Sequence, residues 1–404
     1  MKRLAKSMAM MLAVLLIIGV VAACGTGSQN ASENPSQSSS ESSSQSQETQ
    51  DTQTAPAADL KVGYLFMEMN DPTYISTFMN QETVYKTAGI GVVKETITGL
   101  DPEGMVNGYQ KLIDSGVDAI ELMGMSQAIV PIVQEMCEKA GVYFVITARE
   151  IYDPNVLAKL EGSKYYLGNF YADEENTGYM GMKKMTELGA KDVCVIAGPV
   201  GDPASDARDR GIDKAVQETG VNILTTVREL NTAADITKAV ESMVAAFPDM
   251  DGIFVSYTWA AGAMPALQKV LETAGLAGKI KVGRIDFDTT MSEYFDKGQL
   301  DFTYGAQMHL GAVAAPIVIV NQLMGTPLSD KPMIFASPYE LRTSSEGTAE
   351  YYKYFEGQIP VYTEDELNDM FFKFKNLEVT GDSVMERFKA FSIADVAERH
   401  KDMG

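Results

Sequence analysis

Short apolar runs alternate along the chain with longer segments in which apolar residues recur every three to four positions. The short runs are typical of strands covered on both faces, and the longer segments are typical of helices with one buried face. The pattern predicts strands at residues 60–66, 89–96, 117–123, 142–147, 165–169, 192–196, 222–229, 252–256, 280–285 and 301–305. It predicts helices at residues 75–88, 102–115, 126–140, 174–188, 205–219, 233–247, 258–274, 290–297 and 312–324.

Strands and helices that alternate in this way form parallel sheets with right-handed crossovers. The pattern starts at residue 60 and starts again at about residue 165, and the two sets have similar lengths. We therefore expect an α/β protein of two Rossmann-like, doubly wound lobes joined by a hinge of three chain crossings. The N-terminal lobe is expected at 59–167 and 308–336, the C-terminal lobe at 168–307 and 337–345, and the crossings near 165–169, 307–310 and 336–339.

The last part of the chain, residues 346–404, lacks this alternation and is rich in Tyr, Phe, Lys and Glu. Gly357, Pro360 and Gly381 interrupt it, so we expect a helical extension of two or three short helices packed on the outside of the lobes. The run Phe371-Phe-Lys-Phe either covers the core or presents a surface to a partner, and a helix face that covers the core is the expectation.

The N-terminus has the pattern of a secretory signal, with a basic start and an apolar run from Met8 to Ala23 that is short for a membrane span. Cys24 follows Val21-Ala-Ala and resembles the lipidated cysteine of the bacterial lipoprotein box; the alternative is an ordinary signal with an incidental cysteine. Residues 24–58 are mostly Ser, Gln, Glu and Thr, which predicts a disordered tether. We therefore expect a signal peptide at 1–23 and an extracytoplasmic protein anchored to the cell membrane through a lipid on Cys24.

Composition excludes several classes of function. The formal net charge is -22 and the chain has no basic stripe, which argues against a nucleic acid as partner. The only histidines are His309 and His400, so neither a metal site of several histidines nor a His-dependent hydrolase is expected, and no cofactor is implied. Cys137 and Cys194 lie in apolar patterns and are expected to be buried free thiols.

One strand-loop-helix segment, residues 192–230, carries candidate chemistry. Its loop contains Gly198, Pro199, Gly201 and Pro203, and the helix that follows carries Arg208. Ligands of open α/β sheets bind at the carboxyl ends of the strands, where helix N-termini point. A guanidinium there can bind two oxygens of a ligand, and the alternative is a surface ion pair with a neighbouring aspartate. The loop lacks the Lys-Ser/Thr of a nucleotide-binding P-loop, so a nucleotide hydrolase is not expected.

Several further segments share their order and spacing with one protein family. They are Val62-Gly-Tyr with Asn70-Asp-Pro-Thr-Tyr, Asp114-Ser-Gly-Val-Asp-Ala-Ile, Asp173-Glu-Glu-Asn-Thr-Gly, Val195-Ile-Ala-Gly-Pro-Val-Gly with Arg208-Asp-Arg-Gly-Ile, Val282-Gly-Arg-Ile-Asp, and Lys297-Gly-Gln-Leu with Gln307. From about residue 60 to residue 340 the chain resembles the type I periplasmic solute-binding proteins, especially the sugar-binding branch related to ribose-binding protein. In that family a sugar lies between the two lobes, held by aromatic faces and by charged and amide side chains.

The resemblance implies a set of ligand-binding residues. It places Asp71, Thr73 and Tyr74 on the first contact loop, Arg208 and Asp286 at the family's binding Arg and Asp, and Gln307 beside the hinge. Arg149 and Glu150 replace an Asp-Arg pair with the charges reversed, Ser256 begins a segment that replaces Asn-Asp, and Thr73 replaces an aromatic residue. Trp259, the only Trp, is either a stacking platform for the ligand or a core anchor. These departures put a simple pentose in doubt and leave a larger or nucleoside-like ligand open.

One enzyme motif needs to be weighed. Asp286-Phe-Asp-Thr-Thr matches the Asp-x-Asp-x-Thr loop of haloacid-dehalogenase-type phosphatases, in which the first Asp is the nucleophile and magnesium is bound. That loop normally follows the first strand of its domain, whereas here it follows a late strand. A phosphatase is therefore only a remote alternative.

Our interpretation is a monomeric, non-enzymatic solute-binding lipoprotein without cofactor or metal. It captures a small polar ligand, a sugar or sugar derivative, and delivers it to the permease of an ABC transporter. The alternative is a sensor that passes the same binding event to a membrane histidine kinase.

Overall fold

The computed structural model describes residues 59–67, 72–287, 290–306, 308–355, 357 and 359–403, without the side chains of residues 72, 73 and 306. The predicted signal peptide, the lipidation site Cys24 and the tether lie outside the described residues. Among the described helices, none is long and apolar enough to cross a membrane.

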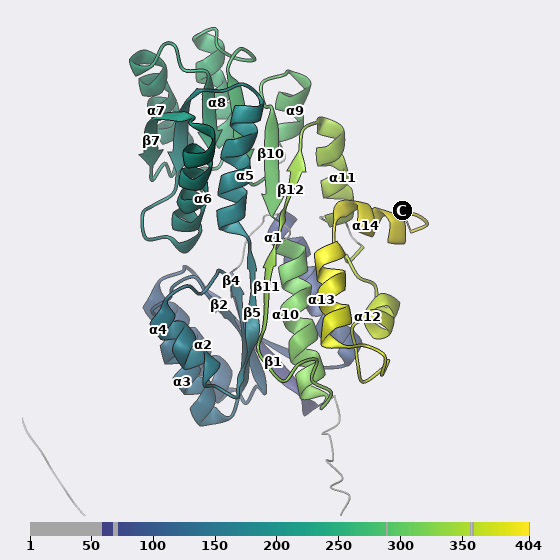
Figure 1. Cartoon of the computed structure of the whole chain (residues 1–404). Helices are drawn as coiled ribbons and strands as arrows, with labels where there is room; N and C mark the ends of the chain where they lie inside the picture. The colour runs from purple at the N-terminus through teal and green to yellow at the C-terminus, as the bar shows by residue number, and fades with distance from the viewer. Residues whose placement is uncertain are drawn as a thin grey trace, which may run out of the picture. The chain divides into compact units, whose positions relative to one another are not determined.

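The first lobe is built on six parallel strands in the order β11-β5-β4-β3-β1-β2 (Figure 1). The strands are β1 (Lys61–Met67), β2 (Gly91–Ile97), β3 (Ala119–Met123), β4 (Tyr143–Ala148), β5 (Tyr166–Ala172) and β11 (Met333–Ser337). Helices α1 (Pro72–Ala88) and α10 (Met308–Leu323) cover one face, and α2 (Pro102–Asp114), α3 (Val130–Ala140) and α4 (Pro154–Glu161) cover the other. The sequence pattern missed α4, a short helix that Asp153 caps.

The second lobe repeats this plan in the order β12-β10-β9-β8-β6-β7, with only β12 antiparallel to its neighbour. Its strands are β6 (Asp192–Ala197), β7 (Asn222–Arg228), β8 (Gly252–Val255), β9 (Lys281–Ile285), β10 (Phe302–Ala306) and β12 (Tyr339–Arg342). Helices α5 (Glu174–Glu187) and α6 (Pro203–Thr219) cover one face, and α7 (Ala233–Ala246), α8 (Ala263–Thr273) and α9 (Met291–Asp296) cover the other. The predicted pair of doubly wound lobes is confirmed.

The chain passes between the lobes three times, as predicted. The crossings lie between β5 and α5, between β10 and α10, and between β11 and β12. The first one falls at about residue 173, later than the sequence pattern suggested, because β5 pairs with β4 and β11 up to Ala172. The expected lobe boundary at residue 167 therefore falls inside a strand of the first sheet.

The predicted helical extension is present and contains four helices: α11 (Ser345–Phe355), α12 (Glu364–Met370), α13 (Gly381–Ala390) and α14 (Ile393–Arg399). It is more than an outer layer, because Phe371, Phe372 and Phe388 are completely buried in one core cluster with α1, α10 and the first sheet. The first two residues of the aromatic run, Phe371 and Phe372, thus cover the core and are not exposed to a partner.

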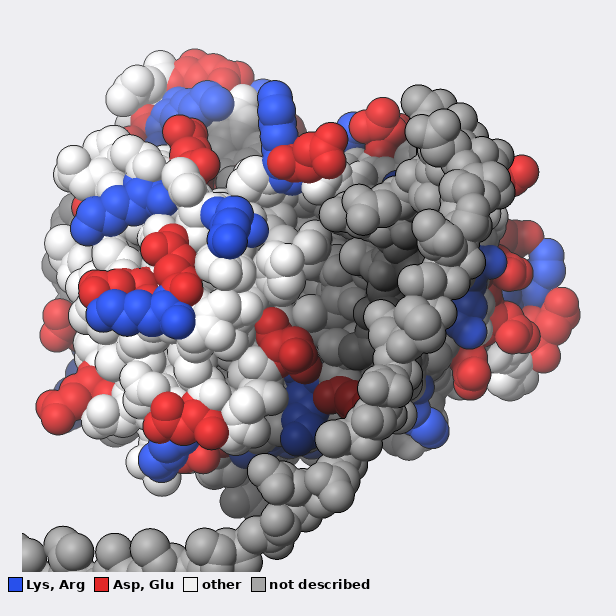
Figure 2. All heavy atoms as spheres, turned by 90° about the horizontal axis from the view of Figure 1, so that it is seen from below, with Lys and Arg blue, Asp and Glu red and all other residues white. Residues whose placement is uncertain are grey.

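Two expectations about the surface and the thiols can be compared with the structure. Cys137 and Cys194 are both free and buried, because each belongs to an apolar cluster of its own lobe. On the face that Figure 2 shows, basic side chains alternate with acidic ones and form no basic stripe.

Candidate functional site

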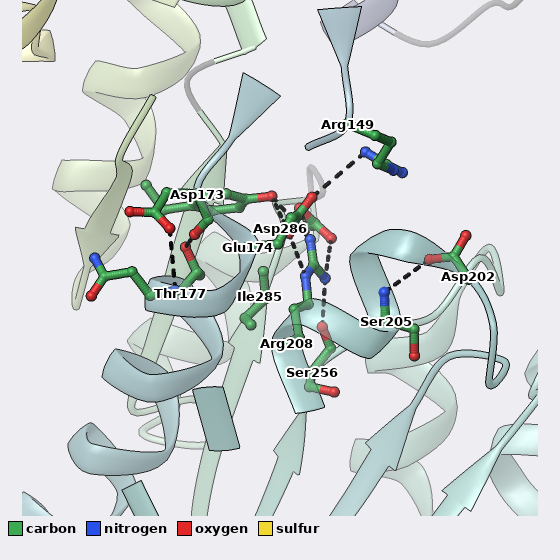
Figure 3. Close-up of polar contacts among 12 residues, drawn as sticks. Arg149, Asp173, Glu174, Thr177, Asp202, Ser205, Arg208, Ser256, Ile285 and Asp286 are labelled. Atoms are coloured by element: carbon green, nitrogen blue, oxygen red, sulfur yellow. Dashed lines mark hydrogen bonds and ion pairs between the residues drawn. The ribbon is translucent and has the colours of Figure 1, made fainter. Parts of the chain in front are cut away.

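Arg208 lies at the centre of a buried polar cluster at the carboxyl ends of the strands of the second lobe (Figure 3). It projects from the second turn of α6, which Pro203 begins and Asp202 caps by accepting the Ser205 N–H at 2.9 Å. The alternative surface pair did not form, because Asp206 accepts the Gly201 N–H and Asp209 pairs with Arg228 at 2.7 Å. The side chain of Arg208 is only 3% exposed.

Two glycines bring α6 close enough to α5 for this cluster to form. A Cβ on Gly211 would lie 1.9 Å from the Glu175 carbonyl oxygen, and a Cβ on Gly178 would lie 2.2 Å from the Arg208 carbonyl oxygen. Only residues without a side chain fit at such a crossing. The close approach sets the start of α5, and with it Glu174, beside the Arg208 guanidinium.

Acceptors of the protein engage every nitrogen of the Arg208 guanidinium. Its Nε donates to Glu174 Oε2 at 2.7 Å, and one terminal nitrogen donates to the Ser256 carbonyl at 2.5 Å and to Asp286 Oδ2 at 3.1 Å. The other donates to the Tyr339 hydroxyl at 3.0 Å. Burial lowers the pKa of Arg208, but the charges of Asp286 and Glu174 outweigh it and hold that pKa well above its usual value.

Two of these partners, Glu174 and Tyr339, were not among the predicted site residues. Glu174 is 6% exposed and accepts a second hydrogen bond from the Tyr339 hydroxyl at 2.8 Å. The available signal was its place directly after the N-cap Asp173, at the helix start that the family motif marks. Tyr339 had no local signal, because it lies 131 residues from Arg208 and meets it only through β12.

Arg149 and Glu150 join this cluster from the first lobe, where they follow β4. The closest terminal nitrogen of Arg149 lies 3.6 Å from Glu174 Oε1, and Glu150 lies 3.7 Å from Arg210 of α6. These two ion pairs connect the lobes at the predicted positions. Arg149 Nε is buried and has no hydrogen-bond partner among the described residues, and the same is true of Ser205 Oγ. Buried donors of this kind normally have a hydrogen-bond partner, so these two groups are available to bind a polar ligand.

Asp286 combines an unusual backbone conformation with a partly exposed carboxylate. Its φ is 75°, an unfavourable value for a residue with a side chain, and its N–H donates to the Tyr304 carbonyl at 2.7 Å. Its carboxylate is 42% exposed although it accepts from Arg208. Asp288 and Thr289 of the phosphatase motif lie outside the described residues. No group of three or more metal-binding side chains occurs among the residues that are described.

Aromatic side chains border the cluster. The guanidinium carbon of Arg208 lies 5.2 Å from the ring centre of Tyr257 and 5.7 Å from that of Tyr339, so the two rings flank it. Trp259 meets Tyr257 edge to face at 5.8 Å and is 54% exposed, so it is not a core anchor. Trp259 lies on a loop and not on the predicted helix, because α8 begins at Ala263.

Of the remaining predicted residues, Ser256 contacts Arg208, Tyr74 lies in a groove of the first lobe, and the others have no described side chain. Ser256 contributes its carbonyl, while its buried hydroxyl donates to the Ile196 carbonyl at 3.2 Å. Tyr74 lines a groove of about 640 Å³ between α1 and the strands β1 and β2. Asp71 and Gln307 lie outside the described residues, as does the side chain of Thr73.

This fold, with a polar cluster at the carboxyl strand ends, defines a two-lobed binding protein. Residues 62–326 match the family model described as the periplasmic binding protein domain, and the chain belongs to that family. The comparison with curated proteins found no match.

Solved structures with this fold include three solute-binding proteins of ABC transporters. One from Burkholderia graminis, in complex with D-arabinose, is 19% identical with a TM-score of 0.62, over 73% of this chain and 98% of its own. One from Actinobacillus succinogenes, with bound D-allose, is 21% identical with a TM-score of 0.61, over 72% of this chain and 100% of its own. One from Agrobacterium vitis, bound with alpha-D-tagatopyranose, is 17% identical with a TM-score of 0.61, over 73% of this chain and 98% of its own.

Proposed function

We propose that this protein is an extracytoplasmic solute-binding lipoprotein that captures a sugar or sugar derivative between its two lobes. It then delivers the ligand to the permease of an ABC transporter, without performing chemistry on it. The family supports this function, as do the sugars that the structural neighbours named above carry. Lipid attachment at Cys24 would keep the protein at the membrane where the permease works.

The polar cluster is the observation that carries the proposal. It combines two arginines, two carboxylates and a tyrosine hydroxyl. Arg149 comes from the first lobe, and the other groups come from the second. Sugar hydroxyls both donate and accept hydrogen bonds, so a site for them needs acceptors and donors side by side. The apolar face of a sugar ring needs an aromatic surface, which the half-exposed Trp259 supplies.

The hydrogen-bond network suggests that some of the predicted ligand residues position the others and do not bind the ligand themselves. Arg208 already donates to four protein groups, so we assign it the task of holding Glu174 and Asp286 in place. Asp286, with an exposed carboxylate, and Arg149, with an unpartnered Nε, have capacity left for a ligand. Closure of the lobes would bring the first-lobe and second-lobe groups onto the same ligand.

A thermal-shift screen over sugars, polyols, nucleosides and amino acids tests the proposal. A ligand at ~100 times its dissociation constant stabilises the folded state by about 2.7 kcal/mol, which is readily detected. We expect a sugar or polyol to raise the melting temperature of the wild type and to raise it much less in Trp259→Ala and Asp286→Asn. Stabilisation by amino acids or nucleosides alone would refute the sugar assignment.

A further inference from the structure

The C-terminal extension reaches the hinge as well as the core. It begins in the second lobe, where α11 follows β12 and Ser345 donates to Asp296 of α9 at 2.6 Å. It then enters the first lobe, where the Val361 N–H donates to Asn80 of α1 at 2.7 Å. Finally α14 returns to the second lobe, and the Ile393 N–H donates to Glu340 of β12 at 2.8 Å. The extension therefore spans the two lobes in addition to the three crossings.

At the end of α11 the extension is attached to the start of α10, immediately after the second crossing. The Ser76 hydroxyl of α1 donates to the Phe355 carbonyl at 2.5 Å and lies 2.5 Å from His309 Nε2. Because that hydroxyl proton is used, the His309 N–H is the donor in the second bond. Ser76, His309 and Phe355 are all buried, so helix α1, the hinge and the extension meet in a solvent-free contact.

One residue of α11 connects this contact to Asp286 of the polar cluster around Arg208. The ring of Tyr351 lies 4.3 Å from the ring of Phe287, 6.3 Å from that of His309 and 5.2 Å from that of Phe355, measured between centres. Phe287 directly follows Asp286 and rests on Gly305 of β10, where a Cβ would lie 1.7 Å from its ring. Gly305 comes just before the second crossing.

We propose that the extension is a working part of the hinge, and that Tyr351 is a positioning residue for the site. Tyr351 holds Phe287 on Gly305, which fixes the unfavourable backbone of Asp286 and the start of α10 together. Movement of one lobe relative to the other then requires these rings to rearrange. The family model matches residues 62–326, so Tyr351 lies outside the matched segment.

Hydrogen-deuterium exchange on the full, ligand-free chain tests this proposal, and it does so whether or not a sugar is the ligand. In Tyr351→Ala we expect exchange at residues 283–287 and 302–312 to become about tenfold faster, a loss of ~1.4 kcal/mol of local protection. Phe372→Ala is the matched control, because this buried ring of the extension stacks on Phe374, and the next residue, Lys373, donates its N–H to Asn321 near the C-terminal end of α10.

A second readout separates positioning from mere support. Spin labels at the exposed positions Lys139 of α3 and Lys269 of α8 report the distance between lobes. We expect a broader distance distribution in Tyr351→Ala and in Gly305→Ala, which displaces Phe287 without touching the extension. Tyr351→Leu replaces Tyr351→Ala if the latter does not fold. Equal exchange and equal distances in the Tyr351 variants and the Phe372 control would overturn the proposal.

Discussion

Glu174 and Asp286 hold the Arg208 guanidinium in a position that is almost closed to solvent. A buried ion pair of this kind adds little stability compared with apolar packing, but removal of one partner leaves the others uncompensated. Arg210, two residues further on, carries the same charge on the exposed side of α6 and pairs with Glu175 at 2.8 Å. The two arginines thus allow a direct comparison of buried and exposed charge.

We predict that Arg208→Ala lowers the free energy of unfolding by about 3–5 kcal/mol, because it removes the buried cation that Glu174 and Asp286 share. Arg210→Ala should lower it by no more than about 1 kcal/mol. Urea unfolding of both variants measures the difference. Similar values for the two would show that the buried network does not contribute to stability as proposed.

Glu121 is a second buried acid, and it belongs to the core of the first lobe. It lies on the central strand β3 beneath α1 and accepts from Gln81 at 2.8 Å and from Tyr85 at 2.5 Å. Burial raises its pKa from 4.5 to about 7, although the two hydrogen bonds lower it. The folded protein therefore binds a proton here more tightly than the unfolded chain does, so this group contributes stability below pH 4.5 that is lost as the pH rises through about 7.

We predict that Glu121→Gln reduces the loss of stability between pH 4.5 and pH 8 by up to about 3 kcal/mol, because an amide cannot ionise. Unfolding free energies across this pH range test the prediction. The exposed Glu135→Gln is the control and should leave the pH profile nearly unchanged. A wild-type profile that is flat from pH 5 to pH 8 would contradict the assignment.

Among the elements, the pair α5 and α6 depends on the absence of side chains at their crossing. Gly178 and Gly211 let the two backbones approach, and this approach places Glu174 beside Arg208. Helical glycines usually reduce stability, so their presence here has a geometric reason. Gly311 of α10 offers a contrast, since a Cβ there would meet nothing within 4 Å.

We predict that Gly211→Ala destabilises the protein by at least about 1–3 kcal/mol, because the new methyl group forces α6 away from α5. Gly311→Ala should be neutral or stabilising by up to about 1 kcal/mol, since alanine is the better helix former. Thermal unfolding compares the two. An unchanged melting temperature in Gly211→Ala would show that the close approach of these helices is not needed.

For the whole molecule, the anchor and the hinge act together in the proposed function. The lobes are tied by three crossings and by the extension, and the chain before residue 59 would attach them to the membrane. A lipid at Cys24 would keep the two lobes near the membrane.

We predict that Cys24→Ser moves the protein from the membrane fraction to the medium, because the signal would still direct export while no lipid could be attached. Cys137→Ser is the control and should leave the protein in the membrane fraction, since Cys137 is a buried thiol of the first lobe. Immunoblots of the two fractions measure the outcome. A soluble wild-type protein would exclude the anchor.

The sequence was sufficient for most of the order of elements from β1 to α10, for the two lobes and for the position of Arg208 at the carboxyl end of a strand, but the short strands β11 and β12 were missed. These features follow from local periodicity and from turn residues such as the Gly198–Pro203 loop, which short windows of sequence contain. The start of α8 and the helix α4 were misjudged, because short or irregular segments give weak periodic signals.

The partners of Arg208 and the role of the extension were decided only by the tertiary structure. Arg208 meets Glu174 at a separation of 34 residues, Asp286 at 78 and Tyr339 at 131, and no local pattern records such contacts. Likewise, the sequence predicted that the aromatic run of the extension covers the core, whereas the contact of Tyr351 with the hinge is seen only in the structure. Periodicity shows which face of an element is buried, whereas the identity of the buried neighbours depends on how distant elements pack.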